Sequence, residues 1–359
     1  MVPRERNRTV SKVLVTGGCG YFGSSLVRHL LDHGHDVRIF DLVDDVDPDL
    51  GRDVDVVIGD IRDRSAIDRA VAGIDVAYHN VAQVPLARDP ELLTTVNVDG
   101  TRNLLDAAVV AGVGRVVHTS SSAVFGVPRE LPVLTSTPLS PAEAYGRAKA
   151  EAEVICHEYT DRLDVTIVRP RTILGHGRLG IFGILFDWIA DGADPFVLGR
   201  GDNRYQFVHA DDLADLCRRA GDTPGSHLLN AGTDRFGTMF EALDSLCRHA
   251  ATGSRVRRLP ATPTTLAMRG AAALRIAPFA PYHWLMYGQS MWFEVEHATR
   301  LTGWSPRWSN DDMFRQSYDW FLEHRDHTSR SESGASHHRR SARQGALGVL
   351  KRATRLLPG

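Results

Sequence analysis

The chain has 359 residues, a formal net charge of -2 and 24% charged residues. This balance gives no overall attraction to nucleic acid or to an anionic membrane surface. No run of about 18 apolar residues is present, and the first residues lack the apolar core of a signal peptide. The four cysteines have no C-x-x-C spacing, so neither a disulfide framework nor a metal site is predicted. The composition favours a cytoplasmic globular protein.

The most informative segment is the first predicted strand and the loop after it. Residues 12–16 form a β-branched run, and Gly17, Gly20 and Gly23 follow with G-x-x-G-x-x-G spacing before a helix-like pattern. Such glycines make a tight turn, let the backbone approach a pyrophosphate, and let helix and strand pack closely. The N-terminus of the helix would face the phosphates with its partial positive charge. The segment predicts dinucleotide binding.

Asp41 ends the second predicted strand, residues 36–40. A carboxylate at that place can accept hydrogen bonds from the adenosine ribose and would repel a 2′-phosphate. NAD is therefore predicted rather than NADP. The alternative interpretation is an ordinary solvated turn residue, because four further aspartates follow in the same loop.

Strand and helix patterns alternate through the first half of the chain. Strands are predicted over 54–59, 75–79, 115–119 and 164–168, and helices over 62–72, 91–111 and 142–159. Short apolar strands separated by helices indicate an α/β fold: a doubly wound, Rossmann-like parallel sheet with helices on both faces. The NAD-binding domain is predicted to cover residues 10–170, and later segments of about 203–232 are expected to return to it.

Tyr145 and Lys149 are four residues apart and therefore share one face of the helix predicted over 142–159. A phenol is a poor base at neutral pH, but an adjacent ammonium and a cationic nicotinamide both stabilise the phenolate. The preceding strand ends in a row of hydroxyls from Thr119 to Ser122. One of these serines could hydrogen-bond a substrate oxygen while Tyr145 moves its proton.

The alternation loosens after Pro170. Residues 171–325 are predicted to form mainly a smaller, substrate-binding lobe over the carboxyl ends of the strands. Residues 326–359 are rich in Ser, His, Arg and Gly, and we expect a disordered basic tail. Its end could form a short basic amphipathic helix at a membrane surface, although a frayed, solvated end is favoured. No stable membrane insertion is expected.

These motifs, in this order, resemble the extended short-chain dehydrogenase/reductase superfamily, and within it the NAD-dependent epimerase/dehydratase family. The resemblance covers about residues 12–323 and rests on segments 16–23, 59–63, 79–82, 97–105, 145–149, 168–170, 207–214 and 301–306. It implies a Rossmann-like fold, NAD as cofactor, a small-molecule substrate, no nucleic-acid partner and a homodimer.

The resemblance also assigns site residues. Tyr145 would be the catalytic acid/base, with Lys149 as its partner and nicotinamide-ribose ligand. Ser121 would hold the substrate hydroxyl beside Ser122, and Arg204 would reach a substrate diphosphate. The implied cofactor-binding residues are Gly17, Gly20, Tyr21, Phe22, Gly23, Asp41, Asp60, Ile61, Val81, Ala82, Asn97, Tyr145, Lys149 and Pro170.

Two departures from the family pattern narrow the function. Dehydratases of the family usually carry Thr-Asp-Glu where this chain has Ser121-Ser122-Ala123, which argues against a 4,6-dehydratase. Many sugar-nucleotide epimerases place Arg-Asp-Tyr/Phe before the later histidine, whereas here the spacing around Arg204 is shifted.

Three functions stay open. The leading prediction is a nucleoside-diphosphate-sugar 4-epimerase, in which hydride leaves the sugar and returns to its other face. The alternative is a net dehydrogenase or reductase of an apolar secondary alcohol, resembling the 3β-hydroxysteroid dehydrogenase and dihydroflavonol reductase branches, because segment 276–287 is unusually apolar. The third is a non-catalytic NAD-binding regulator, against which the intact Ser121, Tyr145 and Lys149 argue.

Overall fold

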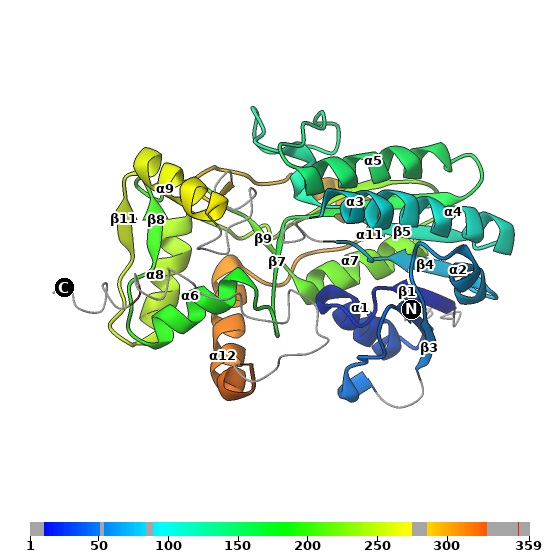
Figure 1. Ribbon diagram of the computed structural model, residues 1–359, viewed down its shortest axis with the longest axis horizontal. Helices are drawn as coiled ribbons and strands as arrows, with labels where there is room; N and C mark the ends of the chain where they lie inside the picture. The colour runs from blue at the N-terminus through cyan, green and yellow to red at the C-terminus, as the bar shows by residue number, and fades with distance from the viewer. Residues whose placement is uncertain (1–10, 51–53, 84–88, 275–285, 329–350, 352–359) are drawn as a thin grey trace, which may run out of the picture.

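A seven-stranded parallel sheet forms the centre of the molecule (Figure 1). The computed structural model describes residues 11–50, 54–83, 89–274, 286–328 and 351. The strands lie in the order β10-β6-β5-β4-β1-β2-β3, and every neighbouring pair is parallel. In that order their bounds are Leu228–Ala231, Asp164–Pro170, Arg115–Thr119, Val76–His79, Lys12–Thr16, Asp36–Asp41 and Asp55–Ile58.

Helices cover both faces of this sheet, which confirms the doubly wound, Rossmann-like prediction. One face carries α1, α7 and α11, and the other carries α2, α4 and α5 (Figure 1). Successive side chains of a strand point to opposite faces, so Val13 and Val15 of β1 pack in one apolar core while Leu14 packs in the other. The bounds of these helices, in the same order, are Tyr21–Asp32, Ala210–Asp222, Glu296–Thr302, Arg64–Val71, Gly100–Ala111 and Ala144–Glu158.

The strand order changes direction at β1. The chain builds β2 and β3 on one side of β1, and then β4, β5 and β6 on the other. In open α/β sheets, ligands bind outside the carboxyl ends of the strands at such a reversal. The ends of β1, β2, β4, β5 and β6 therefore mark where a ligand should bind.

The helix predicted over 91–111 is interrupted. The structure divides it into α3 (Pro90–Thr94), a π-helical turn η2 (Thr95–Asp99) and α4. The wider turn contains the buried Asn97, whose side chain bonds to the backbone of Gln83 rather than facing solvent. A π turn often accompanies such a functional constraint, and apolar periodicity does not reveal it. Two short 3₁₀ turns, η1 (Pro48–Leu50) and η3 (Ser122–Phe125), were also not predicted.

A smaller lobe lies beyond the carboxyl ends of the strands, on the left of Figure 1. It has two parallel strand pairs, β7 with β9 and β8 with β11. Helices α6, α8 and α12 pack around an apolar cluster that includes Phe186, Leu246 and Phe314. The strands β7, β8, β9 and β11 are Thr172–Leu174, Phe196–Leu198, Phe207–His209 and Arg257–Leu259, and the helices α6, α8, α9 and α12 are Ile181–Ala190, Met239–Ala250, Ala261–Ala273 and Asn310–Thr328.

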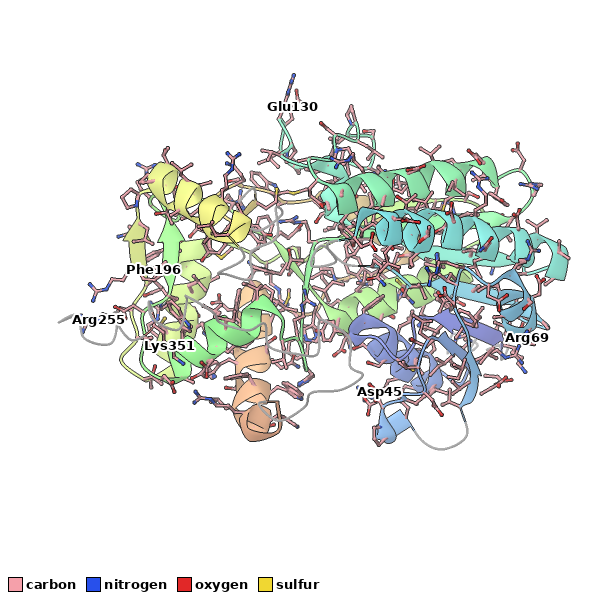
Figure 2. The ribbon with its side chains drawn as sticks, in the orientation of Figure 1. Asp45, Arg69, Glu130, Phe196, Arg255 and Lys351 are labelled. Atoms are coloured by element: carbon pink, nitrogen blue, oxygen red, sulfur yellow. The ribbon has the colours of Figure 1, made fainter. Side chains whose placement is uncertain are left out.

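Strand β10 is an edge strand of the large sheet, and α7 packs against α1 on one of its faces. The division into domains, including the return of about 203–232 to the NAD-binding domain, stays a prediction. Most of the predicted tail, 326–359, lies outside the described residues. Its described part includes Lys351 (Figure 2). Lys351 ion-pairs with Asp187 of α6 and with Asp191, which directly follows that helix; its Nζ lies 2.8 Å from Asp191 Oδ2. In the described part of the chain, no helix combines the length and the apolar character needed to cross a bilayer.

Candidate cofactor and substrate site

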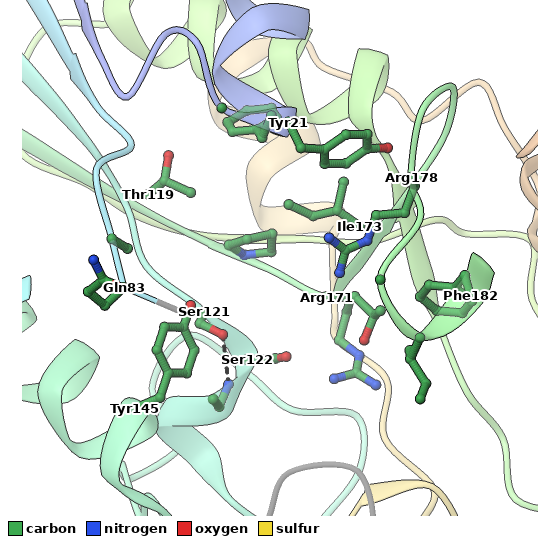
Figure 3. A pocket seen from close by; sticks show the side chains of 18 of the residues that line it. Tyr21, Gln83, Thr119, Ser121, Ser122, Tyr145, Arg171, Ile173, Arg178 and Phe182 are labelled. Carbon is green, nitrogen blue, oxygen red and sulfur yellow. Dashed lines mark hydrogen bonds between the residues drawn. The ribbon is translucent and has the colours of Figure 1, made fainter. Parts of the chain in front are cut away.

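A cavity of about 980 Å³ opens at the carboxyl ends of the strands, between the large sheet and the smaller lobe (Figure 3). Its walls include most of the predicted site residues: Ser121, Ser122, and every predicted cofactor ligand except Asn97. Arg204 is not among the lining residues. One cavity therefore brings together residues that the sequence separates widely.

The glycine loop is shaped by backbone contacts that side chains would block. Gly17 has a φ of +72°, in the left-handed region, and its N–H donates to the carbonyl of Phe40 at 2.7 Å. A Cβ on Gly23 would lie 1.9 Å from the carbonyl oxygen of Gly17, so only glycine allows α1 to start this close to the loop. Tyr21, Phe22 and Gly23 at the start of α1 line the cavity. The first N–H groups of a helix have no partner within it, so this end can serve as an anion site.

Asp41 lies at the end of β2 and is tied to the glycine loop. Its two carboxylate oxygens accept from the backbone N–H of Cys19 at 3.0 Å and of Leu42 at 2.8 Å. Burial raises the pKa of Asp41, and these backbone donors oppose the rise. The carboxylate is thus fixed at the cavity wall, where a ribose hydroxyl could donate to it.

Asp60 and Ile61 line the same end of the cavity, beyond β3. Arg62 pairs with Asp60, and this pairing lowers the pKa of the Asp60 carboxyl. Val81 and Ala82, which follow β4, also line the cavity. Asn97 acts behind this wall: its side chain donates to the carbonyl of Gln83 at 3.1 Å and accepts from the N–H of Gln83 at 2.7 Å.

These features fit NAD. The loop and the start of α1 offer N–H donors for a diphosphate, Asp41 offers an acceptor for a ribose, and apolar walls flank the space for an adenine. The carboxylate at Asp41 would repel the 2′-phosphate of NADP.

Tyr145 and Lys149 enter the cavity from α5. Glu143 caps this helix by accepting from the N–H groups of Tyr145 and Gly146 at 2.8 and 2.7 Å. A Cβ on Gly146 would lie 2.5 Å from the carbonyl oxygen of Ala123, so glycine permits α5 to pack against η3. This contact brings Tyr145 to the serine-rich turn, and Figure 3 shows its hydroxyl directed toward Ser121.

The Lys149 ammonium is buried beneath this site and donates to the carbonyl of Thr119 at 2.8 Å. Burial lowers the pKa of Lys149 to about 8, and the charges of Cys156 and Glu153 oppose that shift. Ser121 caps η3: its Oγ accepts from the N–H of Ala123 at 3.2 Å (Figure 3). The hydroxyl proton of Ser121 stays available to a ligand oxygen.

Arg204 is exposed, and its guanidinium carbon lies 4.8 Å from the Phe236 ring centroid and 4.7 Å from that of Trp292. The next residue, Tyr205, is buried and lines the cavity instead. Neighbouring residues in an extended chain point to opposite sides, so the shifted spacing noted in the sequence leaves the arginine outside the cavity lining.

Two other arginines, which the sequence analysis missed, line the cavity: Arg171 and Arg178 (Figure 3). Arg171 follows β6, and Arg178 lies in the loop between β7 and α6. The only sequence signal for Arg171 was its position directly after the predicted cofactor residue Pro170.

The lining residues numbered from 171 upward are called here the substrate half of the cavity; those before it form the cofactor half. Among the described residues of the substrate half, Arg171 and Arg178 are the charged ones, and most others are apolar. Helix α6 contributes Phe182, Leu185 and Trp188, and α9 contributes Met268. The unusually apolar segment 276–287 kept an apolar substrate open; its described residues Met286 and Tyr287 line the cavity, and the rest lies outside the described residues.

Several proteins of known sequence are similar to this chain. Protein y4nG of Sinorhizobium fredii, which is uncharacterised, is 46% identical over 355 residues, or 98% of this chain and 88% of the relative. A UDP-glucose 4-epimerase of Mycolicibacterium smegmatis is 32% identical over 246 residues (62% and 77%). Sterol demethylase protein B of Methylococcus capsulatus is 42% identical over 168 residues (45% and 51%).

Solved structures share the fold. A UDP-glucose 4-epimerase from Stenotrophomonas maltophila, solved with bound NAD and formylated UDP-arabinopyranose, aligns with a TM-score of 0.74 at 22% identity, over 88% of this chain and 99% of that one. A model of the NAD-dependent epimerase/dehydratase family matches residues 13–232, and NAD is the cofactor of that family. The fold, the cofactor-shaped cavity and this match agree, and the chain belongs to the NAD-dependent epimerase/dehydratase family.

Proposed function

We propose that this protein is an NAD-dependent dehydrogenase that oxidises a secondary alcohol on a largely apolar substrate. The observation that carries the proposal is the substrate half of the cavity, where α6, α8 and α9 present apolar side chains such as Phe182, Trp188, Leu243 and Met268. Pockets bind ligands that match their polarity, because apolar area removed from water supplies most of the affinity. A hexose, with hydroxyls around its ring, would leave polar groups unpaired against these walls.

NAD, when bound, supplies the hydride acceptor. In the proposed reaction Tyr145 takes the proton of the substrate hydroxyl, and Ser121 donates a hydrogen bond to the same oxygen. The Lys149 ammonium, held by the Thr119 carbonyl, stabilises the phenolate electrostatically. Because burial lowers the pKa of Lys149 only to about 8, the protonated form of this side chain predominates at neutral pH. The apolar walls exclude water from the reacting groups.

The comparison with known sequences supports this choice. The similarity to sterol demethylase protein B reaches 42% identity, although over less than half of this chain. A protein named 3 beta-hydroxysteroid dehydrogenase/Delta 5-->4-isomerase from Mycobacterium tuberculosis is 34% identical over 218 residues. Ser121, Tyr145 and Lys149 in one cavity speak for an enzyme and against a non-catalytic NAD-binding regulator.

The test is turnover by the purified protein with NAD. Steroid 3β-alcohols and open-chain secondary alcohols form one panel, and UDP-, GDP- and dTDP-sugars form the other. With at least one apolar alcohol, we expect NADH to accumulate in proportion to a ketone product. Absorbance measures the NADH, and mass analysis identifies the ketone. Conversion of a nucleotide sugar without net NADH would reject the dehydrogenase in favour of an epimerase.

A nucleoside-diphosphate-sugar 4-epimerase is the second candidate. The 32% identity to a UDP-glucose 4-epimerase over 246 residues favours it. In this reaction the same Tyr145 and Ser121 would act on the sugar hydroxyl, and hydride would return to the other face of the ring. If Arg204 binds the diphosphate, Arg204→Gln should raise the Michaelis constant for the sugar about tenfold, the value of one charged contact. An unchanged constant would exclude that role for Arg204.

The proposed substrate says nothing about the oligomeric state of the protein or about its cellular location. A homodimer, a cytoplasmic location and the absence of a nucleic-acid partner stay predictions from the sequence. Sedimentation of the purified protein measures the first directly.

A further inference from the structure

Two arginine side chains in the substrate half lack charged partners among the residues that the structure describes. Arg171 is 1% exposed, and its Nε and Nη2 atoms have no hydrogen-bond partner among the described residues. The Nε atom of Arg178 is likewise buried without a partner there. No aspartate or glutamate is found among the described lining residues of the substrate half. The proposed oxidation of an alcohol does not by itself use either guanidinium.

The contacts of Arg171 position its guanidinium but leave two of its nitrogens unsatisfied. The guanidinium carbon lies 4.7 Å from the Tyr205 ring centroid and 5.6 Å from that of Phe293, and Nη1 lies 3.1 Å from Met291 Sδ. Aromatic faces and a thioether sulfur attract a cation only weakly compared with a carboxylate. These neighbours hold the group against the cavity wall and leave its Nε and Nη2 donors available.

Arg178 is positioned in a similar way on the neighbouring wall. Its guanidinium carbon lies 5.4 Å from the ring centroid of Tyr21 and 6.0 Å from that of Phe182. Burial lowers the pKa of Arg178, while the Tyr21 and Tyr145 hydroxyls act in the opposite direction. The Arg178 guanidinium is therefore close enough to Tyr145, the proposed acid/base, to interact with it electrostatically. Figure 3 shows both arginines across the cavity from Tyr145.

A buried cation without a counter-charge is costly in free energy, and the cost disappears when a ligand supplies the anion. Arginine presents its N–H groups in a planar fork that matches the oxygens of a carboxylate or a phosphate. Two such forks in a largely apolar half of the cavity select a ligand with one strongly anionic group and an apolar remainder.

We infer that Arg171 and Arg178 form an anion-binding subsite, and that the substrate is an amphipathic acid whose carboxylate or phosphate lies near the oxidised alcohol. The apolar part of this inference rests on the proposed function; the anionic part rests on the two arginines alone. The subsite would orient the substrate, because an anion held here leaves the apolar remainder to fill the space toward α6 and α9.

The test measures binding by calorimetry on the NAD-saturated protein, with decanoate, decyl phosphate and decanol as probes of equal chain length. We expect at least one anionic probe to bind about tenfold or more tightly than decanol, as a charged hydrogen bond would give. Arg171→Gln and Arg178→Gln should each reduce that preference, with NAD affinity unchanged. Arg171→Met fills a similar volume without a charge. It should still bind decanol while losing the preference for the anionic probes, which shows that the lost preference does not come from unfolding.

Arg258→Gln is the matched control, since Arg258 also stacks on an aromatic ring, at 4.2 Å from the Phe240 centroid, but is exposed and outside the cavity lining. It should bind every probe as the unmodified protein does. Equal binding of decanol and both anions would overturn the inference. So would variants that weaken NAD but keep the preference, because the arginines would then hold the cofactor diphosphate.

A third probe, UDP, separates a nucleotide diphosphate from an amphipathic acid. Arginine-dependent binding of UDP, with decanoate and decyl phosphate no tighter than decanol, would overturn the inference and support the epimerase. The subsite and the proposed function can fail separately. Anion preference without NADH formation from any alcohol would retain the subsite and reject the dehydrogenase, whereas NADH formation without anion preference would do the reverse.

Discussion

The two halves of the cavity are built in opposite ways. The cofactor half consists mainly of strand ends and the turns directly after them, with Tyr145 and Lys149 added from α5. Hydrogen bonds to backbone groups fix its side chains: the Asp41 carboxylate accepts from Cys19 and Leu42, and Lys149 donates to Thr119. The substrate half is assembled from α6, α8, α9 and single residues such as Phe314, which come from distant parts of the chain. Most of its described residues are apolar, and its two charged residues, Arg171 and Arg178, have no charged partner among the described residues.

This difference separates cofactor binding, which any substrate of the reaction requires, from the recognition of one particular substrate. A hydride acceptor needs the same diphosphate, ribose and nicotinamide contacts whatever the substrate is, and the parallel sheet supplies them at its reversal point. The substrate half has no such constraint, so its side chains carry the choice of substrate. Changes in the two halves should therefore affect different measured quantities.

The largest effect is expected at Tyr145, which lies between the two halves of the cavity, and it should change turnover without changing NAD binding. Tyr145→Phe should lower turnover about hundredfold to ten-thousandfold, because a positioned acid/base is lost. The dissociation constant of NAD, measured by calorimetry, should stay unchanged, since the phenol acts on the substrate. Lys149→Ala should weaken both turnover and NAD binding.

Tyr159→Phe is the control for this change. Tyr159 caps the other end of α5, where its hydroxyl donates to Asp106 at 2.6 Å, and it does not line the cavity. Its removal should leave turnover intact. A Tyr145→Phe variant with full activity would disprove the assignment of the acid/base.

The next effect tests the cofactor half alone. Asp41→Ala should narrow the preference for NAD over NADP by about 1.5–3 kcal/mol, the value of a charged hydrogen bond, which is roughly tenfold to a hundredfold in relative affinity. Calorimetry with both cofactors measures this ratio. Asp36→Ala, at the exposed start of the same strand, should leave it unchanged. Equal affinities for NAD and NADP in the unmodified protein would contradict the ribose assignment.

The contrast between the halves also explains what could be predicted from the sequence. The glycine loop, Asp41, Tyr145 and Lys149 were recognisable because their roles depend on spacing within one strand-turn-helix unit. The π turn at Thr95–Asp99 was missed, since it responds to the contact of Asn97 with Gln83 and leaves no periodic signal.

The arginines show the same limit more sharply. Arg204 was chosen by its distance from His209, yet side chains alternate in an extended segment, and Tyr205 rather than Arg204 faces the cavity. Arg171 acquires its surroundings from Tyr205, Met291 and Phe293, which come next to it only through tertiary packing. Sequence spacing carries no information about such an encounter.

A smaller effect is expected in the substrate half. Met268→Asn should raise the Michaelis constant for an apolar alcohol about tenfold, or about 1.4 kcal/mol, because part of the apolar contact area is lost. NAD affinity should not change. Leu266→Asn is the control on the same helix, because Leu266 is 69% exposed and does not line the cavity. Equal responses of the two variants would mean that α9 does not contact the substrate.

The last expected effect concerns stability rather than activity, in the framework beneath the cofactor half, where His79 and His118 lie buried side by side in β4 and β5. Burial lowers the pKa of His79 to about 3 and lowers that of His118 well below its usual value, with the nearby Lys149 charge acting in the same direction. His79 bonds to Thr16 and Thr101, whereas neither ring nitrogen of His118 has a partner among the described residues.

The sign of the pH dependence follows from linkage. Below about pH 6.5 an unfolded histidine binds a proton that the folded, buried one does not, so stability is complete above that pH and falls as the pH decreases. His118→Leu should remove one such proton without breaking a hydrogen bond, and should flatten the decline by at most about 1.4 kcal/mol per pH unit. Urea unfolding at several pH values measures the slope. His157→Gln, exposed on α5, should keep the original slope. If the free energy of unfolding of His118→Leu fell with pH as steeply as that of the unmodified protein, His118 would not contribute to the acid sensitivity. The loss of stability at low pH would then come from other buried groups.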